Sequence, residues 1–310
     1  MFNSKHNRHI MTSYYAPRGR RRIYELGQQI AQQYLSPFDQ IIGIIGEAGS
    51  GKSALIKGMF PGLELTNDDD GVNVRPLPLL DVDMETGFFS PHTYHLDIRF
   101  EQGFTQMSML VDAIEEAVRR GKRVIIEHFD LIYPMLKRNA NLLIGVGEQI
   151  IISRPNLFGP FPKEIYDVVY ASLPYRLMSH SAEDLCESCM PAEDVERCQH
   201  SDVKHGFIMA FYDHAPTFDL KELEEKVREM IDAQMSIDYV DESHISIGGT
   251  VHPCTGPRTH VRHTGQIKEF HLLHRFIYDE DTKRYLMVGC VGEGSEELLR
   301  SLETAQSLMF

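Results

Sequence analysis

The sequence predicts an α/β protein of two domains, in which a parallel sheet flanked by helices is followed by a smaller α+β domain. A short, continuously apolar segment at 40–45 (QIIGII) leads directly into a glycine-rich loop and a helix-forming stretch. Strand-like and helix-like patterns then alternate as far as residue 153, which is typical of βαβ units. Near residue 200 this alternation stops, so we expect domains over 1–200 and 201–310.

The composition is that of an ordinary globular protein. Of the 310 residues, 42% are hydrophobic and 25% are charged, and the length suffices for two modest cores. No apolar run approaches the ~18 residues of a membrane span, so we expect no membrane partner. The basic N-terminal stretch has no apolar core after it, so we expect no targeting peptide and a cytoplasmic protein.

Charge and cysteine content limit the partners. A formal net charge of -14 argues against binding nucleic acid over the whole surface, because phosphate contacts need clustered Lys and Arg. The basic run Arg18–Arg22 is interpreted as the solvated start of a helix over 24–34, with a local basic patch as the alternative. The five cysteines are expected to be thiols or metal ligands rather than disulfides.

The predicted elements follow from periodicity and turn residues. In the first domain they are strands at 40–45, 63–66, 124–127 and 149–153, and helices at 24–34, 54–59 and 105–120. In the second domain they are a helix at 220–234 after a mixed stretch at 206–213, short strands between 245 and 291, and a helix at 296–308.

The loop after the first apolar strand carries a phosphate-binding motif. Gly46, Gly51, Lys52 and Ser53 satisfy G-x-x-x-x-G-K-[ST] between a buried strand and a helix. Backbone N–H groups of the loop and the helix N-terminus can converge there on phosphate oxygens. Lys52 would reach the β- and γ-phosphates of ATP, and Ser53 would hold Mg²⁺. The expected nucleotide contacts are Gly46, Glu47, Ala48, Gly49, Ser50, Gly51, Lys52, Ser53 and Ala54.

Carboxylates follow several of the predicted strands. Phosphoryl transfer needs such groups to orient a metal ion or accept a proton, and in a parallel sheet the strand ends share one edge. The alternative for the consecutive aspartates is a solvated turn. The candidates are Asp68, Asp69, Asp70, Glu127 and Asp130, with Asp81 and Asp83 at lower weight.

The order of four segments resembles the uridine kinase family of P-loop kinases. These segments are GEAGSGKS, LELTNDDD, RRGKRVIIEHFDLIYPML and YRLMSHSAEDL, and the resemblance covers residues 38–188. Glu127 and Pro134 match the family's third-strand segment, whereas His128 replaces its glycine. The resemblance implies a P-loop NTPase-type fold and a nucleoside-like acceptor. It also implies catalytic roles for Lys52 and Glu127, Asp68 or Asp69 as the base, and Arg176 in a mobile lid.

Histidine and cysteine residues suggest two alternative zinc sites in the C-terminal part of the chain. Most of the 15 histidines lie after residue 179. The first ligand set is Cys186, Cys189, Cys198 and His200, whose soft donors suit tetrahedral Zn²⁺. The second rests on Cys254 and His260 in HPCTGPRTHVRHTGQIKEFHLL.

That segment resembles the second additional domain, the editing domain, of threonyl- and alanyl-tRNA synthetases, if Arg258 and Thr259 are an insertion. The likeness extends over residues 205–310. In that family a helical H-x3-H pair completes the site, and His180 and Asp184 are its counterpart here. Residues four apart share a helix face, so both could reach one Zn²⁺. A structural role for these histidines in a pocket or interface is the alternative.

Three functions remain open. The first is a kinase that transfers a phosphoryl group from ATP to a nucleoside-like or aminoacyl-like hydroxyl. The second is a metal-dependent hydrolase of mischarged aminoacyl-tRNA or aminoacyl esters with a regulatory ATP site, although the acidic charge disfavours tRNA. The third is a nucleotide-dependent switch without acceptor chemistry. The sequence leaves the oligomeric state open, a homo-oligomer included.

Overall fold

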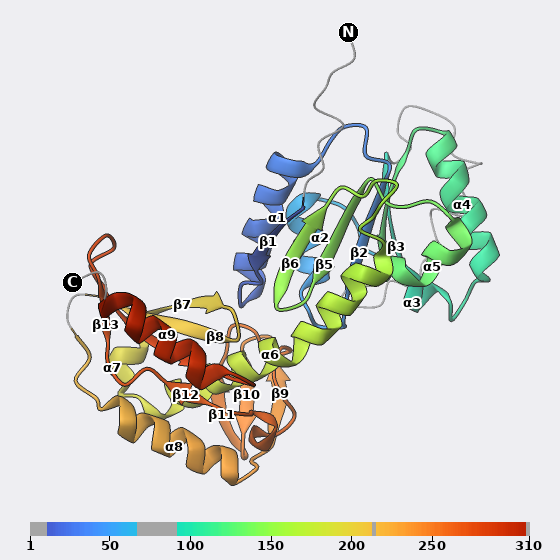
Figure 1. The fold of residues 1–310 in the computed structure, drawn as a ribbon. Helices are drawn as coiled ribbons and strands as arrows, with labels where there is room; N and C mark the ends of the chain where they lie inside the picture. Colours follow the sequence, from blue (N-terminus) through green and yellow to red (C-terminus); the bar gives the residue numbers. More distant parts are fainter. Residues whose placement is uncertain (1–10, 67–91, 213–214, 308–310) are drawn as a thin grey trace. The chain divides into compact units, whose positions relative to one another are not determined.

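The computed structural model describes residues 11–66, 92–212 and 215–307, and the chain divides into two units (Figure 1). The first unit contains residues up to Ala16 together with Arg21–Ala171. The second contains Pro17–Arg20 and the chain from Ser172 onward. The division therefore falls inside helix α6 (Pro162–Cys189), earlier than the change of pattern near residue 200. The reason is that the later turns of α6 pack into the second core.

A six-stranded sheet forms the centre of the first unit (Figure 1). Its order is β1–β6–β5–β2–β4–β3, with bounds β1 (Met11–Tyr15), β2 (Ile41–Gly46), β3 (Thr93–Asp97), β4 (Arg123–Glu127), β5 (Leu142–Val146) and β6 (Gln149–Ser153). The strands β2, β3, β4 and β5 pair in parallel, whereas β6 is antiparallel to both neighbours. The expected parallel sheet is therefore found in four of the six strands, and the sheet as a whole is mixed. Only Gly147 and Glu148 separate β5 from β6, and so short a connection permits only a hairpin.

Most predicted elements of the first unit are confirmed, but the edge of the sheet differs. Helices α1 (Arg20–Tyr34), α2 (Lys52–Met59) and α4 (Met107–Arg119) lie where the periodicity placed them. The predicted strand at 63–66 is wrong, because the position beside β4 is taken by β3. Leu65 is nevertheless buried. The apolar residues there therefore indicate a buried segment that does not pair as a strand.

Helices cover both faces of this sheet. The first face packs against α1 and α2, through a core that joins Ile30 and Ile56 to Ile44. The other face packs against α4, α5 (Phe129–Leu136) and the first turns of α6, through a core that includes Ile114 and Phe129. The short helix α3 (Ile98–Glu101) follows β3. Every residue of β2 is buried, which explains its continuous apolar pattern.

The second unit contains two antiparallel sheets and is α+β, as predicted. The larger sheet has the order β12–β14–β8–β7, with β13 also paired to β14. Its strands are β7 (Cys198–Val203), β8 (Gly206–Phe211), β12 (His271–Leu272), β13 (Ile277–Asp279) and β14 (Arg284–Cys290). The smaller sheet, β11–β10–β9, consists of β9 (Ile237–Asp241), β10 (His244–Ile247) and β11 (Thr250–Pro253).

Helices also pack on both faces of the larger sheet. The later turns of α6 and helix α8 (Leu220–Asp232) share one core with the sheet, in which Leu185 and Val227 accompany Phe207. On the other face, Leu299 of α9 (Ser295–Ser307) packs with Val288. Helix α7 (Ala192–Val195) precedes β7. Among the described residues, no helix combines the length and apolarity needed to cross a membrane.

Candidate functional site

The glycine-rich loop connects β2 to α2, as the motif predicted. Gly49 and Gly51 have φ angles of 75° and 96°, in the left-handed region that favours glycine. A Cβ atom at Gly51 would also lie only 2.5 Å from Cδ1 of Ile23. The loop therefore needs glycine at position 51 for its backbone conformation and for space. Its backbone can approach a ligand closely at the N-terminus of α2.

A cavity of about 200 Å³ lies between this loop and the ends of β3 and β4. Its lining combines loop atoms, two carboxylates and an arginine: Ala48, Gly49, Gly51, Lys52, Ser53, Asp97, Arg99, Phe100, Glu127 and His128. Six predicted site residues thus meet at one cavity: Ala48, Gly49, Gly51, Lys52, Ser53 and Glu127. Asp97 and Arg99 were missed because β3 was not identified, although the TYHLD segment ends in a carboxylate as a site strand would.

Lys52 and Glu127 form a buried ion pair in this cavity. The ammonium Nζ lies 3.4 Å from Oε2 of Glu127 and donates a hydrogen bond of 2.9 Å to the Glu47 carbonyl. On the other side of Glu127, Oε1 lies 3.1 Å from Nε2 of His95. The Thr66 N–H donates to Nδ1 of His95, which leaves the His95 proton on Nε2, facing the carboxylate.

The surroundings of Glu127 keep it ionised. Burial by itself would raise the pKa of Glu127, but the hydrogen bond from His95 and the charge of Lys52 hold the pKa below its usual value. A carboxylate with a low pKa is a poor proton acceptor. Glu127 is therefore better suited to balancing a cation than to acting as the base.

Asp97, Glu127 and His128 form a compact group with ligand atoms within 4.8 Å of one another. Asp97 and Glu127 are direct partners in the register of β3 and β4. Burial and then the Lys52 charge lower the pKa of His128 to about 4, so the ring is neutral at pH 7. His128 has a φ of 55°, the conformation that favours glycine.

Arg99 brings a second cation to the cavity. Its guanidinium donates a 2.8 Å hydrogen bond to Glu47 of the loop, and both side chains are partly exposed. Burial alone would lower the pKa of Arg99, but the Glu47 carboxylate raises it above the usual value. The side chain is therefore charged at the cavity mouth.

The remaining predicted residues lie elsewhere in the described structure or fall outside it. Asp68, Asp69, Asp70, Asp81 and Asp83 fall outside the described residues, so the predicted base stays a prediction. Asp130 lies in α5, where burial raises its pKa. Arg176 is 2% exposed within the second unit, and burial lowers its pKa to about 10. Its assignment to a mobile lid is wrong, because its guanidinium is enclosed in the second unit.

In the second unit, Asp184, Cys254 and His260 come together as the sequence predicted. The His260 Nε2 atom lies 2.8 Å from Asp184 Oδ2 and 3.9 Å from Cys254 Sγ. His180 does not join them. Its ring binds Thr259 Oγ1 at 2.7 Å through Nδ1, and Asp202 Oδ1 at 3.0 Å through Nε2. Thr259 thus holds His180 away from the predicted metal position.

A buried guanidinium occupies the place where the resemblance implies a metal ion. Arg18, 3% exposed, contacts Asp184 and lies 3.2 Å from Cys254 Sγ and 2.6 Å from Glu183. Burial alone would raise the pKa of Cys254, but His260 and the Arg18 charge lower it to about 7. A guanidinium that already contacts Asp184 and Cys254 does not fit a Zn²⁺ ion bound by the same ligands. The run Arg18–Arg22 was expected to be solvent-exposed. This is confirmed for Arg21, but it is wrong for Arg18, which is buried.

The other predicted zinc set is also not assembled. Cys186 is fully buried in the apolar core, and burial raises its pKa well above the usual value. Cys189 contacts the Met230 sulfur at 3.6 Å. Cys198 and His200 instead lie beside Glu187, with ligand atoms within 4.8 Å. The C-x2-C pair packs into the second core because its helix, α6, is the central helix of that core.

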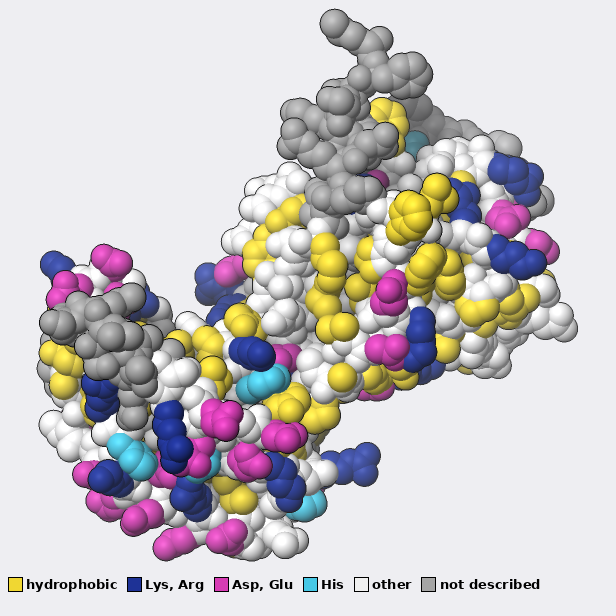
Figure 2. Space-filling model, viewed as in Figure 1, with side chains coloured by type: hydrophobic (Ala, Val, Ile, Leu, Met, Phe, Trp, Pro, Cys, Tyr) yellow, Lys and Arg dark blue, Asp and Glu magenta, His cyan; other side chains and the backbone are white. Residues whose placement is uncertain are grey.

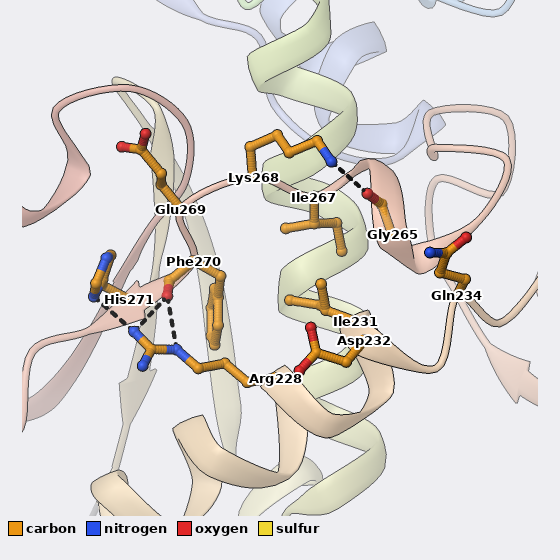
Figure 3. Close-up of a pocket in the computed structure, with 10 residues that line it drawn as sticks. All are labelled: Arg228, Ile231, Asp232, Gln234, Gly265, Ile267, Lys268, Glu269, Phe270 and His271. Atoms are coloured by element: carbon orange, nitrogen blue, oxygen red, sulfur yellow. Dashed lines mark hydrogen bonds between the residues drawn. The ribbon is translucent and has the colours of Figure 1, made fainter.

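A further cavity of about 430 Å³ lies between α8 and the segment 265–271 (Figure 3). Arg228 donates hydrogen bonds to the Phe270 carbonyl at 3.1 Å and to Nδ1 of His271 at 2.8 Å. Lys268 donates to the Gly265 carbonyl at 2.8 Å. Figure 3 shows Arg228 reaching from α8 to Phe270 and His271, and Lys268 turned to Gly265 within its own segment. We interpret the Arg228 contacts as structural, because they join α8 to the segment 265–271.

Comparison of the chain with protein-family models and with curated proteins gives no match. The cavity at the glycine-rich loop is the described site where predicted binding residues, carboxylates and cations converge.

Proposed function

We propose that the first unit binds ATP with Mg²⁺ and transfers the γ-phosphoryl group to a hydroxyl of a nucleoside-like molecule. The observation that carries this proposal is the cavity that places Lys52 and Ser53 of the loop opposite Asp97 and Glu127. Phosphoryl transfer depends mainly on positioning and charge stabilisation, and this cavity offers both signs of charge.

The size and polarity of the cavity suit phosphate groups. Its volume of about 200 Å³ is below the ~300–1,000 Å³ of a typical small-molecule pocket. We therefore expect it to hold the terminal phosphates and the metal ion, with the nucleoside extending beyond it. Loop amides at the start of α2, the Lys52 ammonium and the Arg99 guanidinium would bind the phosphate oxygens.

The oxygen ligands at this edge fit Mg²⁺, which prefers hydroxyl and carboxylate oxygens. Ser53, Asp97 and Glu127 would hold the ion, which would neutralise charge on the phosphates. Glu127 is already ionised and therefore ready for this role. The resemblance to uridine kinases assigns the proton-accepting role to Asp68 or Asp69.

The test is ATP turnover against a panel of nucleosides and amino acids, using the wild type and Lys52→Ala. We expect turnover with at least one acceptor and a loss of at least 100-fold in Lys52→Ala, since the ammonium faces the developing charge. Lys57→Ala is the matched control, because Lys57 lies on the same helix but does not line the cavity. Equal turnover in wild type and Lys52→Ala would rule out a mechanism at this loop.

Two other functions make different predictions in the same assay. A nucleotide-dependent switch would bind ATP in a Lys52-dependent way but consume no acceptor. An aminoacyl-ester hydrolase would act without Lys52 and would lose activity in Cys254→Ser. The resident Arg18 guanidinium counts against a metal-dependent hydrolase at Cys254. On the face shown in Figure 2, basic and acidic side chains intermix over the second unit, which does not favour a tRNA-binding surface.

A further inference from the structure

We propose that the second unit carries a zinc-type metal site formed by Glu187, Cys198 and His200, which ties α6 to β7. The ligand atoms of these residues all lie within 4.8 Å of one another. They combine one thiolate, one imidazole and one carboxylate, a set that suits Zn²⁺ or Co²⁺. The site is separate from the glycine-rich loop and does not depend on the proposed kinase function.

The spacing of the ligand atoms matches a tetrahedral ion. Cys198 Sγ lies 3.5 Å from His200 Nε2, and Glu187 Oε1 lies 3.0 Å from the same nitrogen. Typical zinc bond lengths place tetrahedral S and N ligands ~3.6 Å apart, and N and O ligands ~3.4 Å apart. The nitrogen and sulfur are therefore already at ligand spacing, and the Glu187 oxygen lies ~0.4 Å closer to the nitrogen than a tetrahedral ligand would.

A second carboxylate orients the histidine for this role. Glu183 Oε1 accepts a 2.8 Å hydrogen bond from Nδ1 of His200, so Nε2 is the nitrogen that faces Glu187 and Cys198. The other oxygen of Glu183 accepts from Arg18 at 2.6 Å, which fixes the carboxylate in turn. Metal-bound histidines commonly donate their second N–H to a carboxylate in this way.

Charge and access also distinguish this cluster from the one at Cys254. With Cys198 bound as a thiolate and His200 bound after loss of its Nε2 proton, these two ligands and Glu187 would balance a divalent ion, whereas the Asp184 cluster already contacts the Arg18 guanidinium. The His200 and Glu187 side chains are 27% and 19% exposed, so an ion can reach them from solvent. Three protein ligands leave the fourth tetrahedral position for water.

Cobalt titration of the full-length protein tests the site, because a thiolate ligand gives Co²⁺ a charge-transfer absorption band. We expect one equivalent of Co²⁺ to bind with this band and to be displaced by Zn²⁺. Cys198→Ser should lose the band, and His200→Asn should weaken binding by at least 100-fold. Glu183→Gln should keep the band with roughly 10–100-fold weaker binding, as expected for an outer-shell partner.

Cys189→Ser and Cys254→Ser are the matched controls, and both should keep the band. Cobalt bound at the first unit's carboxylates would give no thiolate band, because that group contains no cysteine. Circular dichroism melts would verify that each variant folds, and the near-isosteric Cys198→Ser is the variant least subject to misfolding. Absence of the band in the folded wild type would overturn the proposal. His200 would then form only hydrogen-bonded ion pairs with Glu183 and Glu187. A band kept in Cys198→Ser and lost in Cys254→Ser would also overturn the proposal.

Discussion

Replacing Arg18 by methionine is expected to lower the free energy of unfolding of the second unit by about 3–5 kcal/mol, the typical cost of breaking a buried ion pair. The change keeps much of the side-chain volume but removes the guanidinium. Glu183 and Asp184, which are 1% and 3% exposed, would then be buried without their cation. Cys254 would also lose a hydrogen-bonding partner.

The matched control is Arg21→Met, four residues before Glu25 on the surface of α1. The Arg21 side chain is 90% exposed, so its ion pair should contribute no more than about 0.5 kcal/mol. Urea unfolding followed by circular dichroism suits a chain without tryptophan, and hydrogen exchange would assign the loss to α6. A loss below about 1 kcal/mol in Arg18→Met would refute the view that this guanidinium is the resident cation of the cluster.

Two further predictions concern the loop and His180. Gly51→Ala should weaken ATP binding, measured by calorimetry, through about 1–3 kcal/mol of backbone strain plus the contact with Ile23. Gly62→Ala, at a similar φ but with open space around it, is the control, and equal affinity in wild type and Gly51→Ala would contradict the prediction. Burial lowers the pKa of His180 from 6.5 to about 4, so the neutral ring stabilises the second unit above pH 6.5 and this contribution is lost as the pH falls toward 4. The stability difference between pH 7.5 and pH 5 should therefore shrink in His180→Asn, and an unchanged difference would contradict this.

The sequence by itself located the elements whose signal is local. The run QIIGII and the glycines after it predicted β2, the loop and α2, because full burial and left-handed φ angles restrict which residues each position accepts. Helical periodicity likewise placed α4 and α8 within a few residues of their bounds. Glu127 was predicted because the end of its strand lies at the sheet edge that carries the glycine-rich loop, where phosphoryl transfer needs carboxylates.

Only the tertiary structure decided which side chains meet across long stretches of chain. His95 pairs with Glu127 because β3, and not the segment at 63–66, lies beside β4. Arg18 reaches Asp184 although 166 positions separate them. Composition and spacing indicate burial and local conformation. The side chains that contact one another depend instead on how whole elements pack and on which buried charges can be paired. For that reason the predicted ligand sets were regrouped, with Thr259 holding His180 and Glu187 joining Cys198.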